Sequence, residues 1–245
     1  MFYTSLVWNI LAMLSETDTR GPDDAFIEEL SRLKRRGASV LVVGSTRASQ
    51  QAETCRRLLG HATDRPRRRI LVSTTGESAP IESLVDETPS DSHRIVRHEI
   101  DVRSASAASS GHESAPSIDV PVTTTETLAD LGIEISSAIE SFETAADGLE
   151  PSELRIGVDS LLPLLETYGT ERVFRFIHLT NGRVGRSDGM IHYRLPVDRE
   201  NEVVSVLTPL FDVVVDLRTH NGVCQERWSL KGESLCSGWI SMRQL

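Results

Sequence analysis

A glycine-led loop between an apolar run and a polar helix is the part of this sequence best placed for phosphate chemistry. Residues 38–43 are mostly apolar, Gly44 ends the run, and a helix is predicted from about Gln50 to Leu59. A phosphate-binding loop has this position and the pattern G-x-x-x-x-G-K-[ST]. Gly44 supplies the first glycine of this pattern. Ser49 stands in place of the second glycine, Gln50 in place of the lysine and Gln51 in place of the serine or threonine. The candidate phosphate-loop residues are Gly44, Ser45, Thr46, Arg47, Ala48, Ser49, Gln50 and Gln51.

The replaced residues change what this loop can do. Gln50 stands at the lysine position and cannot supply the cation that stabilises a transferring phosphoryl group. Gln51 stands at the Ser/Thr position and lacks the hydroxyl that binds magnesium there. Arg47 offers a substitute cation or is simply solvated. Backbone amides at the helix N-terminus retain some capacity for phosphate.

Two acidic residues follow further buried strands and are the remaining candidates for chemistry. Asp159 ends the strand 154–159 and is either a magnesium ligand or the cap of the next helix, and the sequence favours the cap. Glu77 follows the strand 69–73 and is either a base that activates water or a solvated turn residue, which we favour. His178 and His192 flank a predicted loop, 180–189, and no histidine has metal-ligand spacing.

Strand and helix patterns alternate along the chain with short connections. They predict an α/β fold with a mostly parallel central sheet, helices on both faces and an antiparallel C-terminal edge. The simplest organisation is an N-terminal extension, 1–21, and one domain, 22–245, with a flexible Ser/Ala-rich loop at about 103–118. Predicted strands are 38–44, 69–73, 94–100, 119–122, 154–159, 190–195, 211–217, 227–230 and 238–242. Predicted helices are 23–36, 50–59, 80–85, 128–142, 161–168 and 201–210.

The order of these segments resembles RecA-like ATPases of the KaiC/RadA type. LRIGVDSLLPLLETYG is similar to their second Walker strand and helix, and RRILVSTTGESAP to the strand whose turn carries a catalytic acid. MIHYRLPVD, FDVVVDLR and ERWSLKGES follow in the family's order. The family's closing K-x-R-G pattern, which reaches a neighbouring subunit's nucleotide, is represented by Lys231 and, in place of the arginine, Glu233. The chain closely resembles small KaiC/RadA-like proteins of halophilic archaea.

The resemblance implies a RecA-like domain whose hydrolytic positions are altered together. The first expectation is a non-hydrolysing pseudo-ATPase that acts as a regulatory or protein-interaction module. Its partners would be proteins, either further copies of itself or an active ATPase paralogue, and it would need no cofactor. The alternative is a nucleotide-binding ATPase or switch that holds ATP and Mg²⁺ with a lysine-less loop, Asp159 and Glu77.

Charge and composition limit the remaining classes. The net charge of −10 argues against nucleic-acid binding through bulk basic charge, although residues 65–69 (RPRRR) form a local basic cluster. Only two of the 26 basic residues are lysines, a bias typical of a halophile's proteins or of a GC-rich genome. The apolar residues 1–14 are too short for a membrane span and are either a misassigned start or a peripheral element. Three cysteines without a paired motif predict a reduced, cytoplasmic protein.

Overall fold

The computed structural model describes residues 22–46, 48–61, 65–75, 90–99, 120–231 and 235–242. The predicted N-terminal extension, the helix 80–85 and the loop 103–118 lie outside these ranges. In the described part of the chain, no helix is long and apolar enough to cross a membrane.

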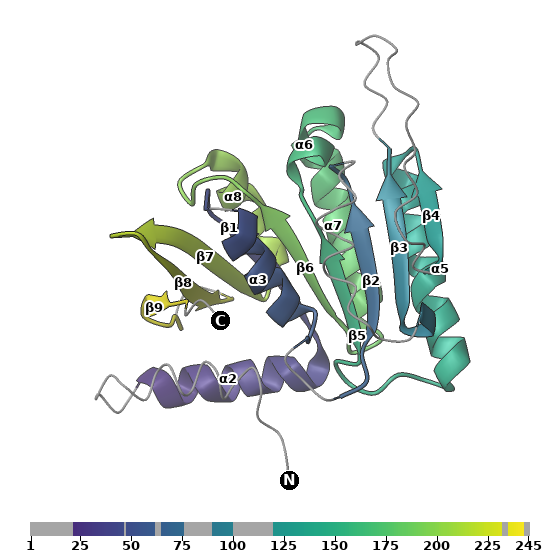
Figure 1. Ribbon diagram of the computed structural model, residues 1–245, viewed down its shortest axis with the longest axis horizontal. Coiled ribbons are helices and arrows are strands. Elements are labelled where there is room, and N and C mark those ends of the chain that lie inside the picture. Colours follow the sequence, from purple (N-terminus) through teal and green to yellow (C-terminus); the bar gives the residue numbers. More distant parts are fainter. Residues whose placement is uncertain are drawn as a thin grey trace.

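One twisted sheet organises the molecule (Figure 1). Nine described strands lie in the order β4-β3-β2-β5-β6-β1-β7-β8-β9, and all pairings from β4 to β7 are parallel. β8 and β9 are antiparallel to their neighbours. The strands are β1 (Ala38–Val43), β2 (Arg68–Ser73), β3 (His93–His98), β4 (Val122–Thr125), β5 (Leu154–Val158), β6 (Met190–Leu195), β7 (Val213–His220), β8 (Val223–Leu230) and β9 (Ile240–Ser241). The predicted α/β class, parallel sheet and antiparallel finish are confirmed.

Helices cover both faces of the sheet because β1 is apolar on both faces. Val40 and Val42 face a cluster formed with α2 and α3, whereas Leu41 and Val43 belong to the cluster under the other helices. Such two-sided burial is typical of a parallel sheet. The helices are α2 (Pro22–Arg36), α3 (Ala48–Leu58), α5 (Leu128–Ala146), α6 (Leu162–Tyr168), α7 (Thr170–Gly185) and α8 (Glu202–Leu207), with short 3-10 helices at Ser90–Ser92 and Thr208–Leu210.

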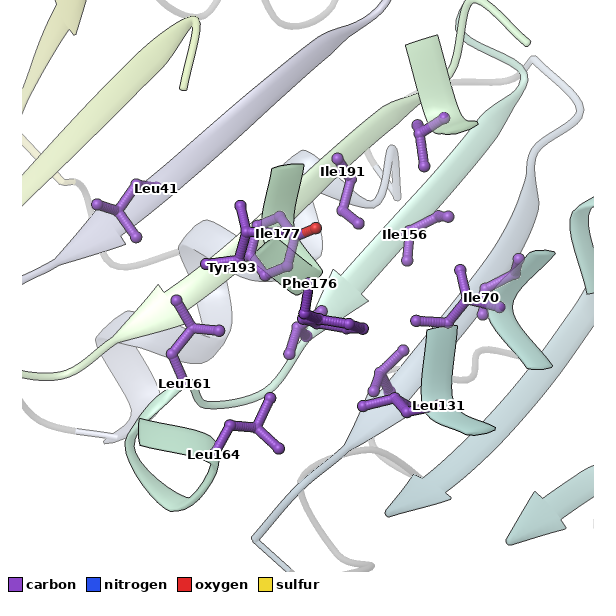
Figure 2. Packing of buried hydrophobic residues seen from close by; sticks show 14 of the residues in the cluster. Leu41, Ile70, Leu131, Ile156, Leu161, Leu164, Phe176, Ile177, Ile191 and Tyr193 are labelled. Carbon is purple, nitrogen blue, oxygen red and sulfur yellow. The ribbon is translucent and has the colours of Figure 1, made fainter. Parts of the chain in front are cut away.

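The larger apolar cluster fills the space between the sheet and α5, α6, α7 and α8 (Figure 2). Tyr193 of β6 lies at its centre, fully buried, and packs edge-on against Phe211 at 5.6 Å between ring centroids. Its hydroxyl donates to Asn181 Oδ1 at 3.0 Å, so its polar atom is satisfied. Burial of each such large side chain stabilises the fold by about 1.5–3 kcal/mol.

Two predicted elements differ from the structure for physical reasons. Residues 180–185 were expected in a loop, which is wrong, because they form the last turns of α7. The segment is rich in Thr, Asn and Gly, but the buried Thr180 and Val184 pack on the core, and tertiary packing overrides weak helix propensity. The predicted helix 201–210 ends at Leu207 and continues as a 3-10 turn, because Pro209 has no N–H for an α-helical hydrogen bond.

Candidate functional site

Gly44 begins the candidate phosphate loop at the carboxyl end of β1, where its backbone packs closely against Leu217 of β7. Its φ is 124°, a conformation that favours glycine, and a Cβ placed there would lie 2.2 Å from the Leu217 carbonyl oxygen. Its N–H donates to the Val197 carbonyl at 2.9 Å, which ties the loop to the segment after β6. The glycine is therefore required by the packing of neighbouring chain, whatever the loop binds.

The Gln51 side chain holds the two ends of the loop backbone together. It is buried, and its Nε2 donates to the carbonyl oxygens of Gly44 at 3.0 Å and Thr46 at 3.1 Å. Both amide hydrogens are then in use. The residue at the position of the magnesium-binding hydroxyl thus holds the loop backbone in its present path. Arg47 lies outside the described residues, as do the side chains of Ala48 and Ser49.

Two polar atoms of residues next to the Gln51 hydrogen bonds are shielded from solvent. The Gln50 Oε1 and Thr46 Oγ1 atoms have no hydrogen-bond partner within the described protein. Ser45, next to Thr46, is exposed. These two oxygens and the first N–H groups of α3 could form hydrogen bonds to a ligand of the loop.

Asp159 joins the ends of two strands. Its Oδ1 accepts from the Thr74 N–H at 2.8 Å and lies 2.7 Å from the Thr74 hydroxyl. Its Oδ2 accepts from the hydroxyls of Thr75 at 2.8 Å and Ser73 at 3.4 Å. These contacts fill the acceptor positions of the carboxylate.

The expectation that Asp159 caps the following helix is wrong. Leu161 stands at the N-cap position of α6 without a side-chain cap, and the Leu162 N–H donates to the Ser160 hydroxyl oxygen at 3.2 Å. Asp159 instead binds residues that follow β2, which pairs with β5. Sequence spacing could not show this, because the partners lie 84 to 86 residues away.

The loop and Asp159 lie at one edge of the sheet. β6 separates β1 from β5, so Gly44 and Asp159 follow strands about 10 Å apart. Ligands of parallel α/β sheets bind outside the carboxyl ends of the strands, where these residues are placed. Glu77 lies outside the described residues.

Arg194 of β6 is a cationic residue at this edge that the sequence analysis did not single out. It pairs in register with Val42, one residue before the end of β1, and its Nε is shielded without a hydrogen-bond partner in the described protein. Burial raises the pKa of the Cys55 thiol of α3 to about 11, and the positive charge of Arg194 acts against that rise. Arg194 therefore lies within electrostatic reach of the underside of α3. The alternation of polar and apolar residues in MIHYRL could have indicated that Arg194 lies near the carboxyl end of this strand.

Lys231 lies at the opposite edge of the sheet. It follows β8, and its N–H donates to the Asp212 carbonyl at 2.8 Å, beside the amino end of β7. Its side chain is exposed and borders a cavity of about 450 Å³ that Phe211, Val214 and Leu230 also line. Glu233 lies outside the described residues.

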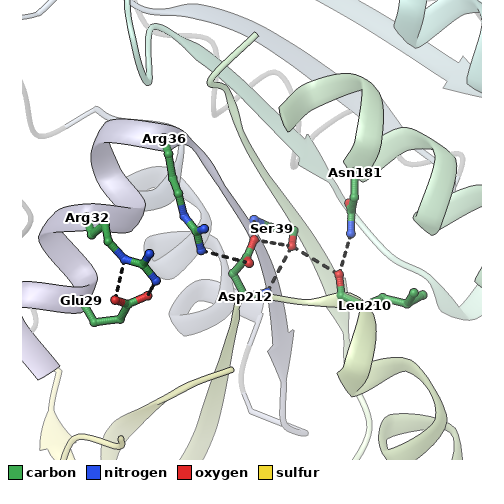
Figure 3. A network of polar contacts seen from close by, with 7 residues as sticks. All are labelled: Glu29, Arg32, Arg36, Ser39, Asn181, Leu210 and Asp212. Atoms are coloured by element: carbon green, nitrogen blue, oxygen red, sulfur yellow. Dashed lines mark hydrogen bonds and ion pairs between the residues drawn. The ribbon is translucent and has the colours of Figure 1, made fainter. Parts of the chain in front are cut away.

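A second cavity, of about 200 Å³, lies at the same amino edge. Figure 3 shows polar side chains that line it, Arg36, Ser39, Asn181 and Asp212, with their contacts. Asp212 accepts from the N–H of Ser39 at 3.0 Å and from its hydroxyl at 2.9 Å, and lies 3.7 Å from Arg36. Asn181 of α7 donates to the Leu210 carbonyl at 2.9 Å. Ser39 also donates to the Leu210 carbonyl, so the polar side chains that line this cavity on α2, β1, α7 and the segment before β7 already have protein partners.

The two histidines named in the sequence analysis do not flank a common loop. His178 is exposed on α7, whereas His192 is buried in β6. Burial, assisted by the charge of Arg155, lowers the pKa of His192 to about 3, so its ring is neutral. Among the described residues, no group of three His, Cys, Asp or Glu side chains is placed to hold a metal ion.

The fold and this edge together define an α/β protein with a doubly wound, mostly parallel sheet and an internally hydrogen-bonded loop after its first strand. Residues 37–217 match the family described as Family of unknown function (DUF7504), and the chain belongs to that family. The matched region contains the parallel strands, the loop and Asp159, and ends within β7, before Lys231. No curated protein matches the chain.

Proposed function

We propose that this chain is a degenerate, non-hydrolysing relative of RecA-like ATPases of the KaiC/RadA type, acting as a regulatory or protein-interaction module in the cytoplasm. The observation that carries the proposal is the double hydrogen bond from Gln51 to the loop carbonyls of Gly44 and Thr46. A side chain that donates both amide hydrogens to its own loop supplies no hydroxyl where a triphosphate site needs one for its metal.

The energetic argument follows from the same contacts. Opening the loop for a triphosphate would break the two Gln51 bonds, at a cost of about 0.5–1.5 kcal/mol each. Recruiting Asp159 to a metal would also disturb its bonds to Thr74 and Thr75. The lysine that would offset these costs is replaced by Gln50. The net charge of −10 favours protein partners, either the chain itself or an active ATPase paralogue, over nucleic acid.

Thermal unfolding in the presence of Mg-ATP or ADP at high salt tests the proposal. We expect no rise in Tm with either nucleotide, since a ligand that binds only the folded state stabilises it by RT ln(1 + [L]/Kd). The double variant Gln50→Lys, Gln51→Thr restores the missing cation and hydroxyl, and should be the first form to bind. Micromolar binding by the unmodified chain would contradict the proposal.

The second candidate is a nucleotide-binding ATPase or switch that uses the lysine-less loop with Asp159 and Glu77. It is favoured by the polar atoms of Thr46 and Gln50 that have no hydrogen-bond partner in the described part of the chain, and by the charge of Arg194 at the same edge. Under this reading ATP hydrolysis is measurable and disappears in Asp159→Asn. If no hydrolysis is seen, the first proposal stands, whereas hydrolysis that survives the substitution would contradict both the first proposal and the role given to Asp159.

A further inference from the structure

The antiparallel end of the sheet, formed by β7, β8 and β9, has one buried side and one partly exposed side. Alternate residues of a strand point to opposite sides of the sheet. The side of β8 that packs toward α2 and α3 carries Cys224, Glu226 and Trp228. The other side carries Val223, Gln225 and Arg227. Val223 is 46% exposed and the Arg227 side chain is 36% exposed, so a partner can reach this side.

Two guanidiniums on the exposed side pack on one tryptophan ring. Trp239 directly precedes β9 and is half-buried. The guanidinium carbon of Arg218 in β7 lies 3.7 Å from the centroid of this ring, and that of Arg227 lies 4.8 Å from it. Both distances are within the range of cation–π interactions. We define the Arg–Trp patch as Arg218, Arg227, Trp239 and the exposed Val223.

The two arginines of the patch differ in the charge of their partners. Arg227 donates to the Asp216 carboxylate, from Nε at 3.2 Å and from Nη2 at 3.0 Å. Arg218 donates from Nε to the neutral Gln225 amide oxygen at 2.9 Å. Among the described residues, no carboxylate pairs with Arg218, and its Nη1 and Nη2 groups donate to no protein acceptor. Its guanidinium is therefore held in place while its charge and its outer N–H groups remain available.

We propose that the Arg–Trp patch is a docking surface for an acidic segment of a partner protein, with a carboxylate bound by the Nη groups of Arg218. A guanidinium offers parallel N–H donors that match the two oxygens of a carboxylate. Packing on Trp239 restricts the Arg218 side chain before binding, so less entropy is lost when the carboxylate binds. Arginine and tryptophan are also the residue types that contribute most to protein interfaces.

The openness of the patch favours a protein segment over a small anion. Neither cavity described above is lined by a member of the patch. A single ion pair at such a partly exposed site contributes little, because water and salt screen it. A peptide segment gains further contacts with the apolar surfaces of Trp239 and Val223, which a small anion does not.

The same features argue against a nucleic acid. Single strands gain much of their affinity by stacking bases on aromatic rings, and the Arg218 guanidinium already lies over the Trp239 ring. A long polyanion would also extend beyond the patch over a chain with ten excess negative charges, whereas a short acidic segment would not.

The inference rests on the protein-interaction part of the proposed function, for which it names the partner's chemistry, and it is independent of the loop after β1. Failure of the patch to bind acidic peptide leaves the expected result with Mg-ATP unchanged. Nucleotide binding by the loop likewise leaves the expected peptide binding unchanged.

Binding of a fluorescein-labelled peptide of alternating Glu and Val residues to the full chain tests the patch by fluorescence anisotropy. Arg218→Gln is compared with Arg175→Gln, which removes the same charge at an exposed position of α7. Arg218→Gln should weaken binding about fivefold, the upper range for a partly exposed ion pair, and Arg175→Gln by less than about twofold. A peptide of alternating Gln and Val should bind the unmodified chain at least about fivefold more weakly than the acidic peptide.

Chemical modification of the unmodified chain gives a second readout that needs no variant. Phenylglyoxal, which reacts with guanidiniums, should modify Arg218, and saturating acidic peptide should protect Arg218 while Arg175 stays reactive. Mass spectrometry of the digested chain measures both sites. No binding of the acidic peptide, equal binding of the neutral peptide, equal losses in the two variants, or no protection of Arg218 would overturn the proposal. Tighter binding of an oligothymidylate of equal charge that Arg218→Gln weakens would also overturn it, because the partner would then be a nucleic acid.

Discussion

At the scale of the residue, adjacent glutamines of α3 have different roles. Gln51 is buried with both amide hydrogens donated to loop carbonyls, whereas Gln50 Oε1 has no partner in the described protein. We expect Gln51→Leu, which keeps the volume and removes both bonds, to lower the free energy of unfolding by about 1–3 kcal/mol in urea denaturation.

The neighbouring substitution Gln50→Leu is the control for this prediction. It alters the same helix at the same loop without removing a described side-chain hydrogen bond, and should change the free energy of unfolding by less than about 0.5 kcal/mol. Equal effects of the two substitutions would show that Gln51 does not hold the loop, and the proposed function would lose its main support.

Asp159 offers a second prediction at this scale. Asp159→Asn replaces one acceptor oxygen with an NH₂ group facing hydroxyl donors, and we expect a loss of about 1–3 kcal/mol in the free energy of unfolding. Thermal unfolding of Asp159→Asn beside Asp198→Asn, an exposed site, measures it. Unchanged stability would mean that the four contacts do not hold β2 to β5.

At the scale of the element, α5 contains a glycine that packing does not require. A Cβ at Gly132 would meet the Phe176 ring at 3.8 Å, an ordinary contact, and glycine inside a helix costs about 1 kcal/mol relative to alanine. Gly132→Ala should therefore raise the free energy of unfolding by about 0.5–1 kcal/mol in denaturant titration. Gly157→Ala in β5 should do the opposite, because its Cβ would lie 2.7 Å from His192 Cε1. A destabilised Gly132→Ala would show that α5 and α7 are packed more tightly than these distances allow.

Elements with a regular apolar pattern could be predicted from the sequence, and those shaped by tertiary contacts could not. β1 and β5 are continuous buried runs and lie where expected, within a residue. α7 was not predicted because Asn181 and Gly182 interrupt the apolar pattern of its last turns. The helix is recognised only from the residues that it buries in the core. At the site, the loop's position followed from the pattern of β1, but the inward turn of Gln51 and the partners of Asp159 depend on segments that the fold brings together.

At the scale of the whole molecule, buried histidine couples stability to pH. The pKa of His192 is about 3 in the folded protein, and an unfolded histidine has a pKa of about 6.5. Between these values the unfolded chain binds the additional proton, so stability rises with pH and is lost as pH falls from about 6.5 toward 3. The cause is burial first and then the nearby charges of Arg155 and Arg194.

Substitution of His192 should flatten this part of the stability profile. The residue contributes up to about 1.4 kcal/mol per pH unit to the slope, so His192→Asn should have a shallower dependence of the free energy of unfolding on pH between about 6 and 4, whatever its stability at pH 7. His178→Asn, at an exposed position of α7, is the matched substitution of a second histidine. Urea denaturation across this range measures both slopes. Parallel profiles for all three proteins would mean that groups other than His192 set the acid limit of the fold and that His192 titrates nearly as freely as it does in the unfolded chain.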